Sequence, residues 1–545
     1  MQTFTGSYTC AAGDQIILKG GETWPNASFT WSIPTCGTSG SPVYVGVDKT
    51  WFTGGSWTRP ILTAGASLIT NNTNRMISIY NNTTFDNFEV TGYYWNTASC
   101  SDPFGQCSMF YMGQTTNEVI ENIYVHGWTH QGTDNTATSG VANIFSFGGG
   151  NSTDIIHDSV FSGTDVLGDH SVNVFFNGPG TAYNNYIRQV SSAMIISYPS
   201  LIHDNTINDI GPSFCNASYS IVNVSGNSVS WVSGDTFTTG SSWNGLAATL
   251  SPVGGVALSS TVSSVSSTTA LTLSSSLGTF SNAALSVFTN AGNCSHENGF
   301  EDNADIGLTF YNNVITNVSA GLALWIAPNP TYTANIFNNV IYGVHDTQVL
   351  DVPAPPVYSS TYCSSGPNGQ GYCNYGGNIV LENNTVQCGD DTTQYITGCS
   401  SSLAPYGSSG TNTYVSRNNH LIVLNLTGTG CGATSNCTFT SNTVQTQSTA
   451  NGQGYNSSQT YAFYPTSGGS TIGAGTNLTG SWPIGSTNDT QYGCTNVSNV
   501  STCPARTSNT RPSSGAWDIG AYQYTSSLGV GTPAGMFAEL FGGGR

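Results

Sequence analysis

Ionisable side chains are scarce in this chain, and they gather in a few segments. Only 7% of the 545 residues are charged. Four segments combine histidine with carboxylates, and they contain five of the eight histidines: VHGWTHQGTDN (125–135), GTDVLGDHS (163–171), CSHENGFEDNAD (294–305) and YGVHDTQ (342–348). Because imidazole and carboxylate groups exchange protons near neutral pH, these segments are where acid–base chemistry is expected.

The densest segment, CSHENGFEDNAD, contributes most of the catalytic candidates. We expect two carboxylates of this region to act as the acid and the base of glycoside hydrolysis. The catalytic candidates are His296, Glu297, Glu301, Asp302, Asp305, Asp169 and His170. The candidates for substrate contact are His130, Trp128, Trp325 and Asp165, since aromatic rings stack on sugars and polar groups orient them.

Other interpretations of the same residues stay open. Polar loops collect Asp and His simply because they are solvated, and Trp128 and Trp325 serve equally well as core residues. Hydrolysis requires no cofactor, although Glu301, Asp302 and Asp305 offer Ca²⁺ a set of oxygen ligands without the spacing of an EF-hand. His157 and His203 each stand in an IHD sequence and are predicted to be structural hydrogen-bonders.

A short motif recurs along the chain around these segments. Apolar residues precede a pair of small polar residues rich in Asn, and a second apolar strand follows, as in FDNFEV and YNNVI. Ten copies are centred on Asn87, Asn122, Asp158, Asn185, Asp204, Asn313, Asn339, Asn384, Asn419 and Asn442, mostly 19–45 residues apart with one gap of 109. A period of this length indicates a solenoid.

The residues within each copy indicate which solenoid forms. β-Branched and aromatic residues alternate with polar ones, which predicts strands and not helices. Asn tolerates the left-handed backbone of a tight corner, and its amide can bond to the coil above or below. We therefore predict an all-β fold, a right-handed parallel β-helix with an Asn ladder. The four acidic segments share the turn after the ladder strand, and coils rise only about 4.8 Å, so they are expected to form one strip on one face.

The ladder, the opening AAGDQIILKGGETW (11–24) and the closing GAWDIGAYQY (515–524) resemble the pectate-lyase-like β-helix superfamily of secreted bacterial proteins and phage tail spikes. The resemblance covers most of the chain and implies the fold, but that superfamily includes lyases, hydrolases, esterases and inactive proteins. Its lyases use calcium and a basic residue beside a uronate. Neither Lys19 nor Lys49 lies near the acidic strip, and a net charge of −19 repels a polyuronate. The sequence thus favours hydrolysis or binding of a neutral glycan.

One elongated domain with an insertion accounts for the length of the chain. We expect an N-terminal cap at 1–60, a first part of the β-helix at 61–214, an inserted all-β module at 215–294, a second part with closing strands at 295–525, and a C-terminal tail at 526–545. The insertion is predicted because the Asn motif stops there while short alternating strands continue. A long linker is the alternative.

Cysteine usage indicates the compartment. The fourteen cysteines form sequence-adjacent pairs, which predict up to seven disulfides: Cys10/Cys36, Cys100/Cys107, Cys215/Cys294, Cys363/Cys373, Cys388/Cys399, Cys431/Cys437 and Cys494/Cys503. Free core thiols are the alternative, and no pair has zinc or redox CxxC spacing. Disulfides point to an extracellular or cell-surface location. The start MQTFTGSYTC has no signal-peptide features, so a phage particle is the alternative location.

Two functions from different classes remain open. The first is a polysaccharide-active enzyme of the glycoside hydrolase type, and the second is a non-catalytic adhesin, stalk or tail-spike-like receptor binder. In both cases the expected partner is a polysaccharide or cell-surface glycan. Nucleic acid is excluded by the scarcity of Lys and Arg, and no apolar run is long enough to span a membrane. A monomer and a homotrimer both fit, because no coiled-coil heptads are present.

Overall fold

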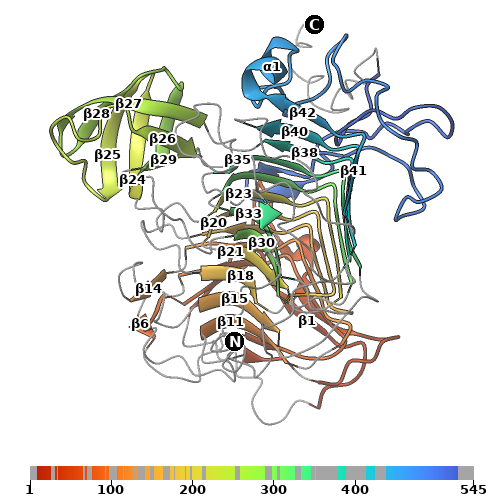
Figure 1. Cartoon of the computed structure of the whole chain (residues 1–545). Helices are drawn as coiled ribbons and strands as arrows, with labels where there is room; N and C mark the ends of the chain where they lie inside the picture. The colour runs from red at the N-terminus through yellow and green to blue at the C-terminus, as the bar shows by residue number, and fades with distance from the viewer. Residues whose placement is uncertain are drawn as a thin grey trace, which may run out of the picture.

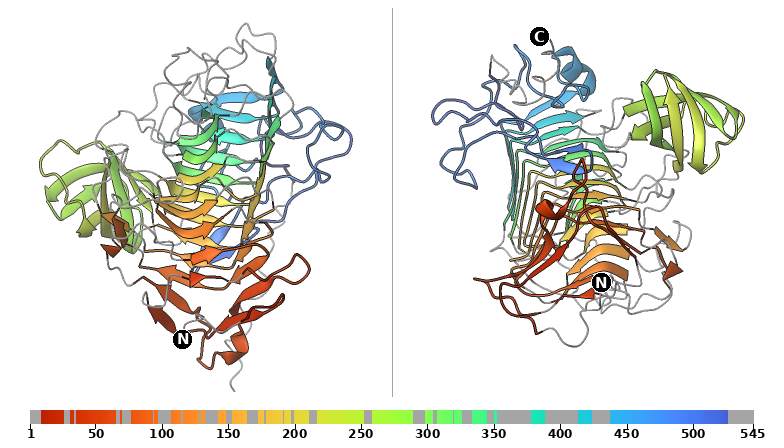
Figure 2. Two further views of the ribbon diagram at one scale, coloured as in Figure 1. Left: turned by 90° about the horizontal axis from the view of Figure 1, so that it is seen from below. Right: turned by 180° about the vertical axis from the view of Figure 1, so that it is seen from behind.

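The computed structural model describes residues 9–25, 31–33, 35–64, 68–69, 77–92, 94–96, 107–113, 116–127, 129–131, 142–147, 153–163, 172–176, 178–190, 192–196, 199–210, 217–251, 258–288, 298–303, 307–318, 320–325, 333–344, 350–351, 378–387, 413–423 and 437–525. These residues wind into stacked coils, and equivalent strands of successive coils form three long parallel sheets (Figures 1 and 2). The predicted parallel β-helix with an inserted β-module is confirmed.

The three sheets are named in the order in which each coil visits them. Sheet A contains β1 (Gln15–Leu18), β4 (Val43–Val47), β8 (Thr83–Asp86), β12 (Val119–Glu121), β16 (Ile155–His157), β19 (Thr181–Tyr183), β22 (Ser200–His203), β31 (Leu308–Tyr311), β34 (Thr333–Phe337), β37 (Asn378–Glu382), β39 (Tyr414–Arg417) and β41 (Cys437–Thr440). Sheet B contains β2 (Thr23–Pro25), β5 (Ile61–Thr63), β9 (Glu89–Thr91), β13 (Tyr124–Val125), β17 (Val160–Ser162), β20 (Tyr186–Val190), β23 (Thr206–Ile210), β32 (Val314–Val318), β35 (Val340–Val344), β38 (Thr385–Gln387), β40 (His420–Val423) and β42 (Thr443–Thr446). Sheet C contains β3 (Trp31–Ser32), β7 (Ile77–Ile79), β11 (Cys107–Met112), β15 (Ala142–Phe147), β18 (Val172–Phe176), β21 (Ser192–Ile196), β30 (Asn298–Asn303), β33 (Ala320–Trp325) and β36 (Leu350–Asp351).

The first coils begin earlier than the sequence suggests. The region expected to be a cap, residues 1–60, contributes strands to all three sheets and holds the short 3₁₀ helix η2 (Lys49–Trp51). The core follows from strand alternation, because one residue in two points inward. Phe110 and Phe145, in register on neighbouring coils of sheet C, stack at 4.7 Å between ring centroids inside the solenoid.

Two polar ladders run side by side at the corner between sheets A and B. The outer ladder consists of corner residues with φ of 51° to 64°: Asn87, Asn122, Asp158, Asn184, Asp204, Asn312, Asn338, Asn383 and Asn418. The inner ladder is buried except for its last member, which is partly exposed, and each amide donates to the next at 3.0–3.2 Å: Asn185, Asn205, Asn313, Asn339, Asn384, Asn419 and Asn442. The sequence motif therefore mixes two structural positions. Asp204 is a corner residue, and its neighbour Asn205 belongs to the inner ladder.

The insertion between β23 and β30 is a closed six-stranded barrel that stands beside the solenoid (Figure 1). Its strands are β24 (Ala217–Ser225), β25 (Ser228–Gly234), β26 (Ala247–Ser251), β27 (Leu258–Ser267), β28 (Ala270–Leu273) and β29 (Thr279–Phe288). They enclose a separate core that includes Val222, Trp243 and Leu285. A smaller sheet of β6 (Leu68–Ile69), β10 (Tyr94–Asn96) and β14 (Thr129–Gln131) also leaves the solenoid between sheets B and C.

After β42 the chain leaves the stack and folds back along it (Figure 2). Helix α1 (Gln447–Gly452) is followed by largely irregular backbone and a hairpin of β43 (Thr495–Val497) and β44 (Val500–Thr502). Phe463 and Tyr522 pack on the outer face of sheet B, and Trp517 lies in a cluster with Phe337 of sheet A. The prediction of a closing strand at 515–524 is wrong, since this segment forms only an isolated bridge there. Its apolar side chains cover outer faces, so its backbone joins no ladder.

Two of the seven predicted disulfides are present, Cys10–Cys36 and Cys494–Cys503. Cys437 is also disulfide-bonded, while its predicted partner Cys431 lies outside the described residues. Cys107 begins β11, and its predicted partner Cys100 lies outside them too.

Three predicted pairs fall wholly outside the residues that the structure describes: Cys215/Cys294, Cys363/Cys373 and Cys388/Cys399. The disulfide expected between Cys215 and Cys294 at the base of the barrel therefore stays a prediction, as do the pairings of Cys363 with Cys373 and of Cys388 with Cys399.

Among the helices that the structure describes, none is long and apolar enough to cross a membrane.

Candidate functional site

The four acidic segments identified in the sequence share one side of the coil. Three of them follow a strand of sheet B and precede the next strand of sheet C, whereas CSHENGFEDNAD follows the barrel and contains β30 of sheet C. Most of the predicted site residues lie outside the described residues: Trp128, Asp165, Asp169, His170, His296, Glu297 and Asp305.

The remaining predicted residues are described only by their backbone. Glu301 lies on β30, in register with Ile195 and Ala323 on the adjacent coils, and Asp302 is next to it. His130 pairs with Trp95 in the small sheet, and Trp325 ends β33. The strip of catalytic carboxylates therefore stays a prediction.

A charged cluster does occur among the described side chains, on the third to fifth coils at the corner between sheets A and B. We call this group the corner cluster, and it consists of Asp86, Glu89, Glu121, His126, His157 and Asp158. Register explains how it forms. Asp86, Glu121 and His157 are paired across successive coils at the ends of β8, β12 and β16. Each follows a fully buried apolar residue, so alternation directs it outward.

Asp86 is the fixed member of the corner cluster. Its carboxylate accepts hydrogen bonds from Tyr44 Oη at 2.6 Å, Asn87 Nδ2 at 2.7 Å and Asn122 Nδ2 at 2.8 Å. Burial raises the pKa of Tyr44, and the bond to Asp86 raises it further. Because its oxygens are occupied and the residue is buried, Asp86 contributes charge rather than a reacting group.

Glu121, His157 and Asp158 form a chain of carboxylate, imidazole and carboxylate. His157 Nε2 lies 3.3 Å from Glu121 Oε2, and His157 Nδ1 lies 2.7 Å from Asp158 Oδ2. The side chains of Glu121 and Asp158 are 27% and 35% exposed, so solvent reaches both carboxyls.

The two carboxyls at the ends of this chain differ in their titration. Burial raises the pKa of Glu121, and the charge of Asp86 adds to that rise. Burial by itself would also raise the pKa of Asp158, but hydrogen bonds from His157 and Asn184 outweigh it, so its pKa lies below the ordinary value. Carboxyls with opposed pKa shifts suit the separate roles of acid and base.

A second carboxylate–imidazole pair lies around the corner on sheet B. Glu89 Oε1 is 3.0 Å from His126 Nε2, and the His126 ring stacks on Tyr124 with 4.1 Å between centroids. His126 belongs to the first of the acidic segments. Arg59 lies beside this pair, and its Nε donates to the carbonyl of Asn122 at 3.0 Å. Burial lowers the pKa of Arg59, while the charges of Glu89 and Asp86 oppose that change.

The C-terminal hairpin reaches the edge of the corner cluster. Arg59 Nη1 donates to the carbonyl of Asn499 at 3.3 Å, and Ser501 Oγ donates to the carbonyl of Asn184 at 2.6 Å. The Cys494–Cys503 disulfide closes the base of the hairpin. Segments more than 300 residues apart therefore meet at this corner.

Above the corner cluster, rings continue the outer column of sheet A. His157, Tyr183, His203, Tyr311 and Phe337 stack with centroids 4.7–5.1 Å apart and planes within 2–11°. The ring faces cover one another and leave only edges exposed, so this stack offers no platform for a sugar face. His157 and His203 each bond to the aspartate that follows, at 2.7 Å, which confirms their predicted hydrogen-bonding role.

Metal binding has little support among the described side chains. The one group of ligand atoms close enough to hold an ion there is Cys10, Asp14 and Cys36. Its two sulfurs form a disulfide, so they are unavailable as thiolate ligands. The expected calcium ligands Glu301, Asp302 and Asp305 have no described side chains, and calcium binding there stays a prediction.

Sequence reasoning missed Glu121 and Asp158 as candidates and assigned His157 a structural role only. The available signal was positional, because Glu121 and His157 both directly precede a corner residue of the repeat, in IENIYV and IHDSVF. Aligning the repeats on their corner residues places the two side chains on adjacent coils.

Comparison with known proteins finds distant structural neighbours. No family model and no curated protein matches the chain. A mutant of the alginate lyase AlyGC, of polysaccharide lyase family 6, is 12% identical with a TM-score of 0.29, over 80% of this chain and 49% of that one. A mannuronic-acid-specific family 6 lyase from the human gut microbiota is 10% identical with a TM-score of 0.30, over 81% and 78%. This chain thus matches about half the length of the first enzyme.

Proposed function

We propose that this protein is an extracellular β-helix that binds a neutral polysaccharide and hydrolyses it at the corner cluster. The observation that carries the proposal is the Glu121–His157–Asp158 chain, whose two carboxyls have pKa values shifted in opposite directions. Hydrolysis of a glycosidic bond needs one carboxylic acid to protonate the leaving oxygen and one carboxylate to act on water or on the sugar.

The environments of the residues assign their roles. Glu121 keeps its proton to higher pH because it is partly buried beside Asp86, so it acts as the general acid. Asp158 stays ionised and activates water as the general base. The His157 ring lies between the two carboxyls and contacts both. His157 is a positioning residue that holds both.

The expected substrate is uncharged. The corner cluster contains four carboxylates against one nearby arginine, and the whole chain has a net charge of −19. Such a field repels polyuronates and sulfated glycans and leaves neutral ones unaffected.

Four proteins test this proposal: wild type, Glu121→Gln, Asp158→Asn and the control Glu22→Gln. Glu22 is an exposed carboxylate that pairs with Lys19 and is not a member of the corner cluster. Each protein is incubated with β-glucan, xylan, mannan, galactan, pectin and alginate, and new reducing ends are measured. We expect cleavage of a neutral glycan, retained in the control and reduced about 100-fold or more in the other two. Absence of cleavage by wild type, or an unchanged rate in Glu121→Gln, rejects the proposal.

A non-catalytic rod is the second candidate, and the ring stack with the buried inner ladder favours it. Both features connect neighbouring coils and stiffen the solenoid. A rod without catalytic activity requires such connections. Glycan binding that is equal in all four proteins, without cleavage, supports this function. A Glu301→Gln/Asp302→Asn variant that abolishes cleavage while Glu121→Gln does not would move the catalytic centre to β30 of sheet C.

A further inference from the structure

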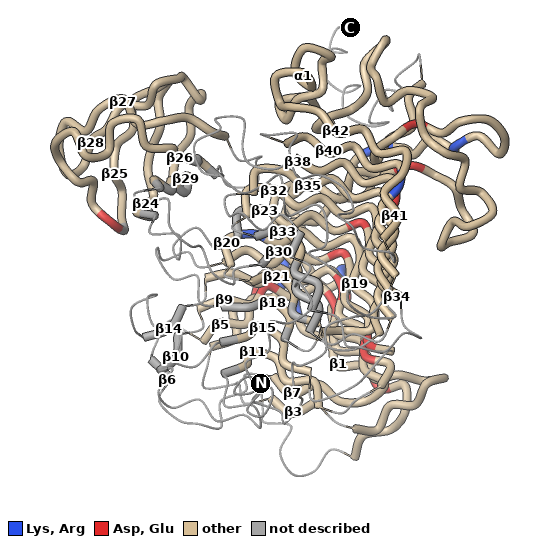
Figure 3. Tube along the Cα trace, in the orientation of Figure 1, with Lys and Arg blue, Asp and Glu red and all other residues tan. Residues whose placement is uncertain are grey.

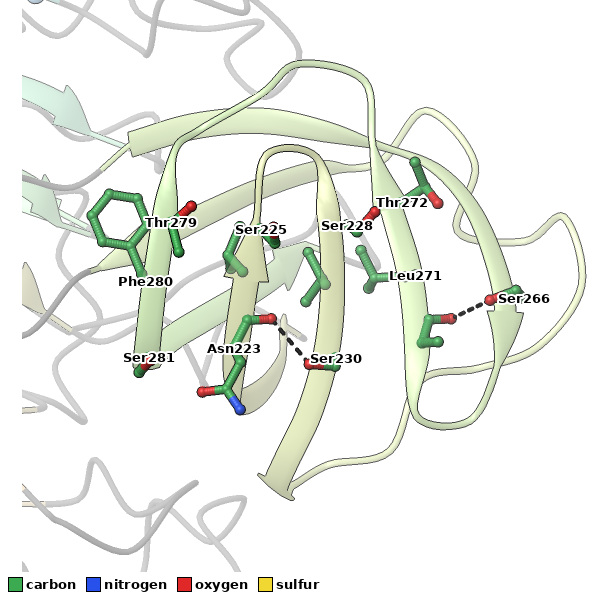
Figure 4. A pocket seen from close by; sticks show the side chains of 13 residues that line it. Asn223, Ser225, Ser228, Ser230, Ser266, Leu271, Thr272, Thr279, Phe280 and Ser281 are labelled. Carbon is green, nitrogen blue, oxygen red and sulfur yellow. Dashed lines mark hydrogen bonds between the residues drawn. The ribbon is translucent and has the colours of Figure 1, made fainter.

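The barrel carries a recess of its own, away from the corner cluster. It has a volume of about 610 Å³ and lies over β24, β25, β27, β28 and β29 (Figure 4). Its lining combines hydroxyl and amide side chains with a few apolar ones, among them Val224, Leu271 and Phe280.

The hydroxyls of this recess form a regular row. Ser225 of β24 pairs with Thr279 of β29 on one side and with Ser228 of β25 on the other, and Ser228 pairs with Thr272 of β28. Four hydroxyl side chains therefore stand in line across four adjacent strands, about 4.8 Å from one strand to the next. A second line contains Asn223 and Ser230.

These hydroxyls are open to a ligand. Ser225, Ser228 and Thr279 are exposed and Thr272 is partly so, and none of their side chains has a hydrogen bond to another described residue. In the second line, Ser230 Oγ donates to the carbonyl of Asn223 at 3.3 Å. A hydroxyl both donates and accepts, as the hydroxyls of a sugar do.

The barrel is nearly free of charge. Residues 217–288 contain one acidic residue, Asp235, and no Lys, Arg, His or Glu, and Figure 3 shows the barrel almost entirely without charged positions. Asp235 is not part of the lining. An anionic ligand would find no cation in the recess, and acid–base catalysis would find no carboxyl or imidazole.

We propose that the barrel is a binding module for a neutral polysaccharide, held in this recess through the hydroxyl row Thr279, Ser225, Ser228 and Thr272. The partly buried Phe280, which also lines the recess, supplies an apolar contact for the carbon-bound hydrogens of a sugar ring. The proposal is independent of the corner cluster, because it assigns a site in the barrel that binds without reacting.

The test uses the full chain in native gel electrophoresis through gels that contain β-glucan, xylan, mannan or galactan, with alginate as the charged comparison. The Ser225→Ala/Ser228→Ala/Thr272→Val/Thr279→Val variant removes the row with little change of shape. The control Ser259→Ala/Ser263→Ala removes two exposed hydroxyls of β27 that lie outside the recess. We expect wild type and control to be retarded equally by a neutral polysaccharide, and the four-site variant to bind about tenfold more weakly or worse.

Ser228→Lys is the second variant, because it introduces one charge at an exposed position without touching the barrel core. It is expected to lose retardation in the neutral gel as well. Retardation is measured apart from the release of reducing ends. Retardation of wild type that the four-site variant loses, without any cleavage, therefore supports this inference even where the hydrolysis proposal fails. Equal retardation of wild type and both recess variants, or retardation of wild type by alginate alone or by no polysaccharide, overturns the inference.

Discussion

The side-chain amide of Asn205 donates to Asn313 Oδ1 at 3.0 Å, although the two residues are 108 positions apart in the chain. The whole barrel is inserted between them, and the inner ladder continues as though the coils were consecutive. The ladder therefore keeps the two flanking coils in register although the chain between them leaves the solenoid.

Removal of one inner-ladder amide is expected to lower the stability of the protein. Asn313 Oδ1 accepts from both the backbone and the side chain of Asn205, so Asn313→Ala leaves buried donors without an acceptor. We expect the free energy of unfolding to fall by about 2–4 kcal/mol in urea titrations. The exposed Asn451→Ala is the control, with a change within about 0.5 kcal/mol. Equal stability of both variants would show that the ladder contributes nothing to stability.

Asp154 is expected to make the protein less stable at alkaline pH. It is fully buried, its Oδ2 has no hydrogen-bond partner within the described part of the chain, and burial raises its pKa to about 7. The folded state therefore holds this proton more tightly than the unfolded state, and stability is lost as pH rises from about 4 through 7.

Asp154→Asn removes that titration. We expect the variant to exceed wild type in free energy of unfolding by roughly 1–3 kcal/mol at pH 8, with the difference shrinking or reversing at pH 5. Urea titrations at both pH values measure it. A difference that does not change with pH contradicts the assignment.

His420 is expected to make the protein less stable at acidic pH. It is buried, its Nε2 lies 3.1 Å from Gln445 Oε1, and burial lowers its pKa to about 4. The unfolded chain takes up this proton near pH 6.5, so stability is lost as pH falls from 6.5 towards 4. Between pH 7 and pH 4 the free energy of unfolding of wild type is expected to fall by roughly 3 kcal/mol more than that of His420→Gln. Parallel stability curves for variant and wild type would refute this.

The Cys494–Cys503 disulfide is expected to hold the C-terminal hairpin on the corner. Cys494→Ser/Cys503→Ser frees its base, which should lower stability by about 2–4 kcal/mol and increase proteolysis within 495–502. Thermal unfolding and limited proteolysis measure the two effects. Wild type treated with a reductant serves as the comparison, and unchanged proteolysis would mean that Ser501 and Asn499 hold the hairpin without the disulfide.

Much of the fold was predictable because its signals are local. Alternation of apolar residues marks strands, and Asn at a tight corner needs no distant partner to favour a left-handed backbone. The sequence did not predict which of two adjacent polar residues enters the core. Asp204 and Asn205, for example, are both small and polar. Their difference appears only when the coil is closed and one of them faces inward.

The candidate site shows where sequence reasoning stops. His157 follows Glu121 by 36 positions, whereas His203 follows Tyr183 by 20, so no constant period aligns the outer columns. The position of Arg59 beside Asn499 depends on a C-terminal segment that packs backwards along the solenoid, and no local pattern indicates that path.

By itself the sequence determined that this chain forms stacked β coils, carries an insertion and has few charges, because these properties follow from neighbouring residues and composition. Only the tertiary structure decided which carboxylates meet imidazoles, which outer faces the C-terminal segment covers and which barrel strands align their hydroxyls. Those outcomes depend on register between segments of unequal length, and register is a property of the closed, hydrogen-bonded coils.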